Sequence, residues 1–257
     1  MKNYFDVSGR IAFVTGASKG LGKMFANTLG DAGAKLFIMA SSEATIAPVC
    51  EEFKAKGYEC ACFWGDITDQ DRMAQAVEEC VKQYGRIDIL VNNAATSRIN
   101  KTPEDTTVEE WNKVININVN GAFIVAQAVG KVMLKQGYGK IINMSSISGK
   151  IINKGVHGGS YDVSKAAIDG LTLALASEWA PKGINVNAIC PGYCLTKPNL
   201  DFFEADPGFY DLALSLIPAG KMADPEQLAG TLLYLASGAS DYLHGSIIRV
   251  DGGYLIW

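Results

Sequence analysis

Short apolar runs alternate with longer amphipathic segments along the chain, and this alternation constrains the fold more than any other feature. Strand-like runs lie at about 10–15, 35–40, 60–66, 87–93, 140–146, 184–192 and 246–250. Helix-like segments lie between them at about 20–30, 43–57, 69–84, 107–135, 161–180 and 225–237. Such alternation predicts an α/β fold with a seven-stranded, doubly wound parallel sheet and helices on both faces. The continuously apolar runs IDILV and SIIRV fit strands that are buried on both faces.

A single domain is expected over residues 1–257. No linker rich in proline, glycine or serine divides the chain, and it contains no repeat or low-complexity segment. The least regular segment is 193–224, which contains Pro198, Pro207 and Pro218. We expect this segment to leave the body of the domain as an excursion of loop and helix.

Composition and charge exclude several classes of partner. The net charge of -4 argues against nucleic acid, and no polybasic run suggests a membrane surface. No stretch is expected to approach the length of a membrane span, and the first apolar run, Ile11–Val14, is too short for a signal peptide, which predicts a cytoplasmic protein. The six cysteines form no CxxC pair and only two histidines are present, which predicts reduced thiols and no metal site.

A glycine-rich turn follows the first strand. Its sequence is TGASKGLG, with Gly16, Gly20 and Gly22 before the first predicted helix. A turn of this kind lets backbone N–H groups approach a pyrophosphate at the positive end of a helix. The spacing G-x-x-x-G-x-G is a moderate signal, since glycines in a tight turn can be purely structural.

Tyr161 and Lys165 form the strongest candidate catalytic pair. Their spacing of four residues in a predicted helix places both side chains on one face, one turn apart. A free tyrosine has a pKa of about 10, and a neighbouring ammonium group favours the phenolate and lowers that value. The pair is therefore a credible general acid and base at a carbonyl carbon. Alone it is weak evidence, because Y-x-x-x-K also occurs in helices by chance.

Polar or small residues follow three other predicted strands, where parallel sheets place their ligands. Asn92–Ala95 follow the run IDILV, Ser145 and Ser146 follow KIINM, and Pro191–Gly192 follow INVNAIC. Together with the glycine turn, four strand ends are suited to line a cofactor. This agreement favours a nucleotide-dependent enzyme over a chance tyrosine–lysine pattern.

The ordered set of motifs resembles that of the short-chain dehydrogenase/reductase family. The set comprises TGASKGLG, Asp66, NNAA, Asn118, Ser146, Tyr161 with Lys165, PGYCLT and a closing VDGG at 250–253. It extends over essentially the whole chain. The resemblance implies a Rossmann fold and an oxidoreductase that moves a hydride between a nicotinamide cofactor and a secondary alcohol or ketone.

The resemblance also implies roles for four catalytic residues. Tyr161 would donate or accept the substrate proton, and Lys165 would lower its pKa and hold the nicotinamide ribose. Ser146, preferred over Ser145 by its place in the motif, would bind the substrate oxygen. Asn118 would kink its helix and hold a water in a proton relay to Lys165. Asn116 and Asn120 are close competitors for this last role.

The cofactor-binding residues implied by the resemblance come from the same strand ends. Asp66 and Ile67 would contact the adenine, Asn93–Ala95 would line the nicotinamide side, and Pro191, Gly192 and Thr196 would hold the carboxamide and pyrophosphate. The full set is Gly16, Ser18, Lys19, Gly20, Leu21, Gly22, Ser41, Ser42, Asp66, Ile67, Asn93, Ala94, Ala95, Tyr161, Lys165, Pro191, Gly192 and Thr196. The family commonly has glycine where this chain has Ala95, which crowds the pocket edge by one methyl group.

The end of the second strand bears on the choice between NADP(H) and NAD(H). An acidic residue there typically holds the ribose 2′-hydroxyl of NAD, but this strand ends in Ser41 and Ser42. Glu43 is interpreted as a helix-start residue. Lys19 suits a 2′-phosphate, although it can also be a solvated surface charge. We expect NADP(H) to be favoured, with NAD(H) as the alternative.

The substrate is constrained less strongly. Segment 193–224 would form the lid, and Arg98, Lys150, Lys154 and Lys197 are possible pocket cations for a carboxylate. The last third of the chain is similar to gluconate 5-dehydrogenases and deoxyketogluconate dehydrogenases, although Lys221–Ala223 replaces the Arg-Trp-Gly common in that branch. This favours a sugar acid, polyol or related hydroxyketone as substrate. The alternatives are a broad-range ketone or steroid reductase and a non-catalytic cofactor-binding regulatory protein.

A homotetramer or homodimer is expected, since the family usually assembles through its long helices. Here these are the predicted helices at 107–135 and 161–180. The apolar run LTLALA in the second helix fits an interface, but packing against the core would explain it as well.

Overall fold

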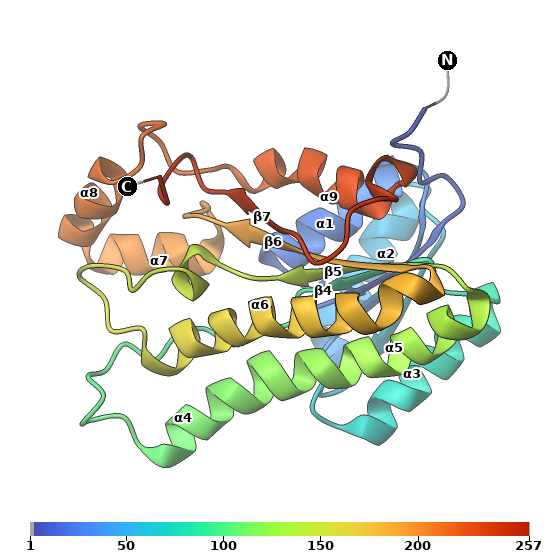
Figure 1. The fold of residues 1–257 in the computed structure, drawn as a ribbon, viewed down its shortest axis with the longest axis horizontal. Helices are drawn as coiled ribbons and strands as arrows, with labels where there is room; N and C mark the ends of the chain where they lie inside the picture. The colour runs from blue at the N-terminus through green and yellow to red at the C-terminus, as the bar shows by residue number, and fades with distance from the viewer. Residues whose placement is uncertain (1–2, 257) are drawn as a thin grey trace.

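Seven parallel strands form one sheet in the order β3-β2-β1-β4-β5-β6-β7 (Figure 1). The computed structural model describes residues 3–256. The strands are β1 (Ile11–Thr15), β2 (Lys35–Ala40), β3 (Cys60–Trp64), β4 (Ile89–Asn92), β5 (Gly139–Met144), β6 (Ile184–Pro191) and β7 (Ile247–Val250). The strand order reverses direction between β1 and β4, as in doubly wound folds. The predicted Rossmann-type α/β fold is confirmed.

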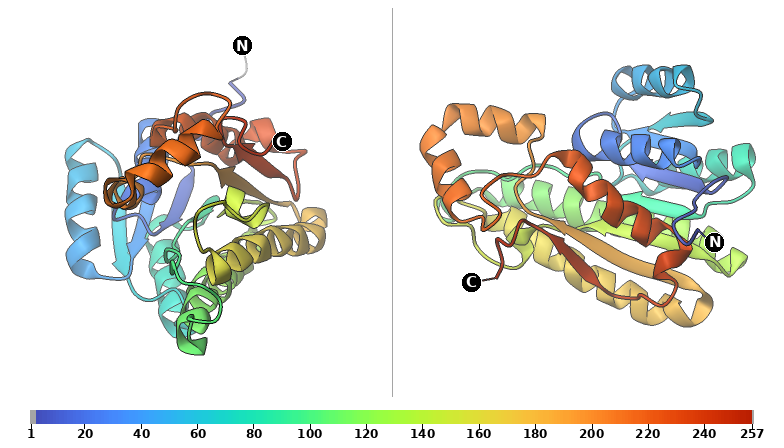
Figure 2. Two further views of the ribbon diagram at one scale, coloured as in Figure 1. Left: turned by 90° about the vertical axis from the view of Figure 1, so that its left-hand side faces the viewer. Right: turned by 90° about the horizontal axis from the view of Figure 1, so that it is seen from above.

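Helices cover both faces of the sheet (Figures 1 and 2). The helices α1 (Gly20–Asp31), α2 (Glu43–Ala55) and α9 (Ala229–Ala236) lie on one face, where α1 contacts both of the others. The helices α3 (Gln70–Tyr84), α5 (Ala122–Gln136) and α6 (Gly159–Trp179) lie on the other, with α4 (Val108–Ile115) preceding α5. Each face therefore buries its own apolar core.

Alternate residues of the central strands supply these two cores. In β1, Val14 belongs to the cluster under α1 and α2, and Phe13 belongs to the cluster on the opposite face. The Phe13 ring stacks on Phe37 of β2 with a centroid distance of 5.1 Å. All five residues of β1 are buried, as expected for a strand covered on both sides. A fully buried side chain of this size contributes about 1.5–3 kcal/mol to folding.

A π-helical turn, Asn116–Gly121, joins α4 to α5, so one long helix runs from Val108 to Gln136. By length and composition this helix could cross a membrane, which corrects the expectation that no stretch approaches a span. Its apolar composition has a simpler cause, because one face packs into the core. Val125, Val129 and Met133 are all buried there.

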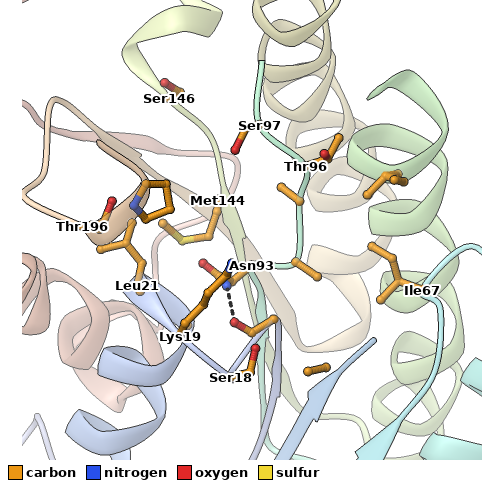
Figure 3. A pocket seen from close by; sticks show the side chains of 18 of the residues that line it. Ser18, Lys19, Leu21, Ile67, Asn93, Thr96, Ser97, Met144, Ser146 and Thr196 are labelled. Carbon is orange, nitrogen blue, oxygen red and sulfur yellow. Dashed lines mark hydrogen bonds between the residues drawn. The ribbon is translucent and has the colours of Figure 1, made fainter. Parts of the chain in front are cut away.

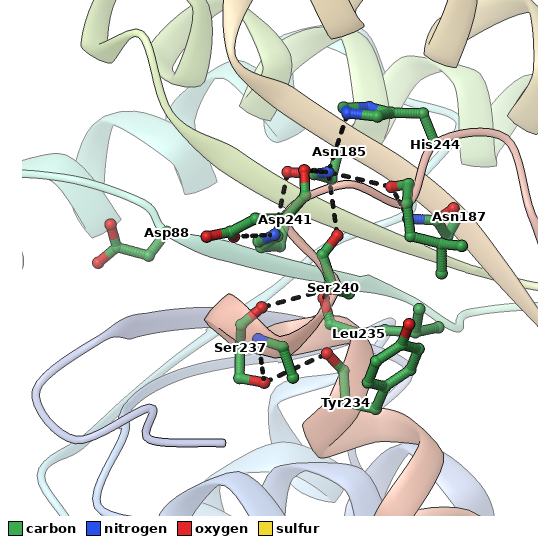
Figure 4. A network of polar contacts seen from close by, with 12 residues as sticks. Asp88, Asn185, Asn187, Tyr234, Leu235, Ser237, Ser240, Asp241 and His244 are labelled. Carbon is green, nitrogen blue, oxygen red and sulfur yellow. Dashed lines mark hydrogen bonds and ion pairs between the residues drawn. The ribbon is translucent and has the colours of Figure 1, made fainter. Parts of the chain in front are cut away.

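A polar network closes the amino end of the sheet (Figure 4). The Lys140 side chain is fully buried on β5, and its Nζ donates to Asn185 at 3.0 Å and to Asp241 at 2.7 Å. Asn185 in turn donates to the backbone carbonyls of Asp241 and Leu243 at 3.0 Å. Burial lowers the pKa of Lys140. This network ties the connection before β7 to the amino end of the sheet.

The segment expected to leave the body of the domain contains two helices, α7 (Lys197–Ala205) and α8 (Pro207–Ser215). They lie beyond the carboxyl ends of the strands (Figure 1). Phe203 and Phe209, one from each helix, pack with Met222 and Tyr254 in a small third core. The sequence pattern did not resolve these helices because prolines and aromatic residues interrupt the helical period.

Candidate active site

A cavity of about 610 Å³ lies at the carboxyl edge of the sheet, beside the point where the strand order reverses. Residues that follow β1 to β6 all contribute to its wall, and Figure 3 shows their side chains around a shared space. Of the predicted cofactor residues, Ser42 is the exception. It precedes α2 and its carbonyl accepts from the Thr45 hydroxyl at 2.9 Å. The cavity is suited in size and position to a nucleotide cofactor.

Sequence reasoning missed several lining residues. They are Met39, Ala40, Gly65, Thr96, Ser97, Ile117, Met144, Cys194, Pro198 and Asn199. Four of them, Met39, Ala40, Gly65 and Met144, lie within the predicted strand ranges, and Thr96, Ser97 and Cys194 follow a predicted strand end by two to four residues. A wider window around each strand end would have included these seven, but Ile117, Pro198 and Asn199 are brought in by tertiary packing.

The glycine-rich turn provides a close approach to the α1 N-terminus. Gly16 has a φ of +66°, and a Cβ atom there would lie 2.9 Å from the Ala94 Cα. A Cβ on Gly22 would lie 2.2 Å from the Gly16 carbonyl oxygen and 2.5 Å from the Asn93 Nδ2. Only glycine fits these two positions without movement. The turn thus exposes backbone N–H groups and the positive helix end to the cavity, which suits a pyrophosphate.

Gly22→Ala is expected to weaken NADPH binding by about tenfold or more, since overpacking of this kind typically costs 1–3 kcal/mol. The new methyl group must displace the turn that faces the cavity. Binding is measured by titration of nucleotide fluorescence, and thermal unfolding is followed in parallel. Gly230→Ala in α9 is the matched control, because a Cβ there meets no atom within 4 Å. Equal NADPH affinity in the two variants would refute the role of the turn.

Hydrogen bonds hold the turns after β1 and β4 together. The Thr15 Oγ1 accepts from the backbone N–H groups of Asn93 and Ala94, each at 3.0 Å. The Asn93 Nδ2 donates to the carbonyls of Thr15 at 3.1 Å and Gly16 at 3.3 Å. The floor of the cavity is therefore rigid before a ligand binds.

Tyr161 and Lys165 face the cavity from the first turns of α6. The Lys165 Nζ lies 5.6 Å from the centre of the Tyr161 ring and donates to the Met144 carbonyl at 2.8 Å. Burial lowers the pKa of Lys165 to about 8, with Asp169 acting in the opposite direction. A lysine with this pKa holds and releases a proton near neutral pH.

The pKa of Tyr161 differs from the expectation that Lys165 would lower it. Burial raises the pKa of the Tyr161 hydroxyl above its ordinary value, and the charge of Arg98 and a hydrogen bond with Ser146 oppose this rise. Lys165 lies over the ring and is bound to a carbonyl, which limits its effect on the hydroxyl. The Arg98 Cζ lies 5.1 Å from the centre of the same ring.

The two serines after β5 have different surroundings. The Ser145 hydroxyl is buried and donates to Asp169 at 2.6 Å, which commits it to the core. The Ser146 hydroxyl accepts from the Ser148 N–H at 3.1 Å and also bonds Tyr161. Ser146 therefore has the geometry to hold a substrate oxygen next to the tyrosine.

Asn118 lies in the π-helical turn, and its side chain is buried. Its Oδ1 accepts from the Thr96 N–H at 2.7 Å, and its Nδ2 donates to the Ser164 hydroxyl at 3.0 Å. Its competitors Asn116 and Asn120 are bonded to each other at 3.0 Å on an exposed surface. Asn118 does not line the cavity, so its amide fixes the loop after β4 to α6.

A second cavity of about 280 Å³ adjoins the first at Ser146 and Tyr161. Phe202 and Phe203 of α7 and Phe209 of α8 form one side of it. Arg98, Asn100 and Ser148 contribute to the polar side. A substrate in this space would reach both the tyrosine and the larger cavity.

Comparisons with known proteins agree with this geometry. The family model described as Enoyl-(Acyl carrier protein) reductase matches residues 16–255. A galactitol 2-dehydrogenase (L-tagatose-forming) from Cereibacter sphaeroides is 36% identical and covers 100% of this chain and 99% of its own. A 2-dehydro-3-deoxy-D-gluconate 5-dehydrogenase from Dickeya dadantii is 38% identical over 98% of each chain.

A solved structure extends these comparisons to three dimensions. A gluconate 5-dehydrogenase from Burkholderia cenocepacia, in complex with NADP and tartrate, aligns with a TM-score of 0.94 and 32% identity. The alignment covers 99% of this chain and 98% of the other. The fold, the cavity at the strand ends and these full-length similarities together establish that the chain belongs to the short-chain dehydrogenase/reductase family of NAD(P)-dependent oxidoreductases acting on CH–OH groups.

Proposed function

We propose that this enzyme interconverts a secondary alcohol and a ketone on a sugar acid, polyol or related hydroxyketone. The observation that carries the substrate class is the polar side of the second cavity, where Arg98, Asn100 and Ser148 lie close to Tyr161. Hydroxyl-rich molecules need such donors and acceptors to replace bound water. Relatives named as galactitol and gluconate dehydrogenases support the same class.

Tyr161 and Ser146 carry the proton chemistry in this proposal. Ser146 holds the substrate oxygen, and the Tyr161 hydroxyl donates its proton in reduction or accepts one in oxidation. Both hydroxyls stabilise negative charge that develops on that oxygen. When bound, the nicotinamide cofactor supplies or takes up the hydride.

Lys165 and Asn118 form a proton relay for Tyr161 in this proposal. Because the Asn118 amide is committed to Thr96 and Ser164, a water in the relay would bind its backbone carbonyl. A π-helical turn alters the normal pairing of helical carbonyls, and such turns often occur at functional sites. Lys165, with its pKa lowered to about 8 by burial, would exchange a proton with this water.

We further propose that the cofactor is preferentially NADP(H). Lys19 and Ser41 line the larger cavity, and both are exposed to a ligand. Glu43 is the first residue of α2, where a carboxylate favours the helix N-terminus. In this proposal, Asp66 and Ile67 contact the adenine, and Thr196 helps to hold the carboxamide and the pyrophosphate. All three residues line the larger cavity.

A lid and an oligomer complete the proposal. Segment 193–224 would cover the substrate, since Phe202 and Phe209 from α7 and α8 line the second cavity. A homotetramer or homodimer would cover the exposed apolar side chains Phe123 of α5 and Leu173 of α6. All six cysteines are free thiols, which agrees with the cytoplasmic location that we propose.

A panel of polyols, sugar acids and bulky ketones, read by nicotinamide absorbance, tests the substrate class. We expect turnover of polyols or sugar acids, because their hydroxyl groups can pair with the polar side of the second cavity. Response to bulky ketones or steroids alone would favour the aromatic side of that cavity and reverse the assignment. Cofactor binding without turnover of any compound would favour a regulatory protein.

A further inference from the structure

Arg98 lines the second cavity next to Tyr161. Among the described residues that line this cavity, it is the one with a full charge at neutral pH. Its guanidinium lies over the Tyr161 ring, so a substrate that reaches the tyrosine hydroxyl must pass close to it. A free arginine at this position would be expected to bind a carboxylate.

This arginine already has a carboxylate partner. The Arg98 Nη2 lies 3.1 Å from the Asp162 Oδ1 and donates to the Ser148 hydroxyl at 2.9 Å. The Asp162 side chain is 2% exposed, compared with 21% for Arg98, so the aspartate lies behind the arginine. The pair is therefore built into the wall, with Arg98 alone reaching the cavity.

The other candidate cations add no positive charge to the lining of the second cavity. Lys150 pairs with Asp169 at 2.9 Å, and Lys197 pairs with Asp201 at 2.7 Å on the exposed surface of α7. Neither lysine lines the second cavity, and Lys154 is exposed outside it. The charge on the substrate side of Tyr161 thus depends on Arg98 and Asp162 together.

Buried polar atoms without a hydrogen-bond partner lie on both members of the pair. The Asp162 Oδ2 and the Asn153 Oδ1 are buried acceptors, and the Arg98 Nη1 is a buried donor, and none of the three has a hydrogen-bond partner among residues 3–256. Asp162 and Asn153 do not line the second cavity, whereas Arg98 does. The Asp162 carboxylate, which accepts from Arg98 and from Ser148, opposes an approaching anion through its negative charge.

We propose that the Arg98–Asp162 pair makes this enzyme select neutral polyhydroxylated substrates over carboxylates, with Asp162 as a specificity-determining residue that acts through Arg98. A carboxylate would lose its hydration shell in the cavity and meet a pair whose charges sum to zero. A hydroxyl group has a smaller desolvation cost, and it can accept from the Arg98 guanidinium. This inference rests on the proposed function and narrows the proposed substrate class to neutral polyols and hydroxyketones.

The test compares an alditol with the aldonate that differs from it only in the terminal CH₂OH or carboxylate group. In wild type we expect a higher kcat/KM for the alditol. Asp162→Asn keeps the shape but removes the negative charge, so we expect the ratio of aldonate to alditol kcat/KM to rise about tenfold. Asp201→Asn is the matched control with an equal change of charge outside the cavity, and its ratio should equal that of wild type.

Arg98→Gln provides an independent measurement if Asp162→Asn does not fold. It leaves the buried carboxylate without its cation, so the ratio of aldonate to alditol kcat/KM should fall below that of wild type. Where both variants fold, opposite changes in the ratio of aldonate to alditol kcat/KM cannot result from a general loss of structure. A wild-type preference for the aldonate, or equal losses for both substrates in each variant, would overturn the inference alone. Turnover of neither substrate by wild type would instead overturn the proposed substrate class.

Discussion

Tyr161→Phe is expected to lower kcat by about 10³-fold while cofactor affinity changes little, since loss of a general acid or base typically costs 10²- to 10⁴-fold. The variant keeps the ring in contact with Lys165 and Arg98 and removes only the hydroxyl. Steady-state turnover is measured with the best substrate from the panel, and nucleotide affinity is measured separately by fluorescence. A large loss of kcat with unchanged nucleotide affinity would identify Tyr161 as a residue that transfers the substrate proton rather than one that binds the cofactor.

Tyr254→Phe is the matched control for this experiment. Tyr254 is buried, its hydroxyl pairs with Tyr193, and it lines neither of the two cavities. We expect the control to retain turnover within a few-fold, although lost hydrogen bonding of this kind costs about 1 kcal/mol of stability. Wild-type turnover in Tyr161→Phe would exclude the proposed mechanism, whatever the control shows.

The alternation of apolar runs was sufficient to predict the strands because parallel strands are buried on both faces. The second strand, 35–40, has the predicted bounds, and the other strands differ by at most two residues at either end. The carboxyl ends of parallel strands meet at one edge of the sheet, so local motifs there predicted most of the cavity wall. Ser42 was the exception, because the chain turns into α2 directly after Ser41.

Features that depend on distant residues could not be read from local patterns. Asp162 follows Tyr161 directly, but its partner Arg98 lies 64 positions earlier in the chain. The sequence suggested Arg98 as one of four cations and gave no sign that it was paired. Likewise, the balance of burial and charge that raises the pKa of Tyr161 depends on how the lid and the loops pack around it.

The burial of Lys140 in the core also could not be predicted from the local sequence. Lys140 begins a continuously apolar strand, and local composition would place a lysine at a solvated strand end. Asp241, 101 residues later, makes its burial possible by pairing with it at 2.7 Å. Burial of a charge is costly unless a partner is present, and partners are set by topology rather than by sequence distance.

The double variant Lys19→Ser, Ser41→Asp is expected to reverse the preference between NADPH and NADH. The change in the ratio of kcat/KM should be similar in size to the fall in kcat caused by Tyr161→Phe. Lys19 precedes α1 and Ser41 follows β2, and both line the nucleotide cavity. Removing the cation weakens attraction for a 2′-phosphate, and the new carboxylate repels it while accepting from a 2′-hydroxyl. A hydrogen bond to a charged group contributes about 1.5–3 kcal/mol, so the two changes should alter the NADPH-to-NADH ratio of kcat/KM by roughly 10²–10³-fold.

Lys23→Ser is the control for the loss of positive charge. Lys23 lies one turn further along α1, pairs with Glu52 at 2.6 Å and does not line the cavity. Its removal should leave the ratio unchanged. Because Lys19 is exposed, the wild-type preference for NADPH should also decrease as ionic strength rises, while the affinity for NADH should vary less. A wild-type preference for NADH, or a ratio that does not respond to salt or to the double variant, would show that Lys19 is a solvated surface charge and that the 2′-phosphate is not recognised at this edge of the sheet.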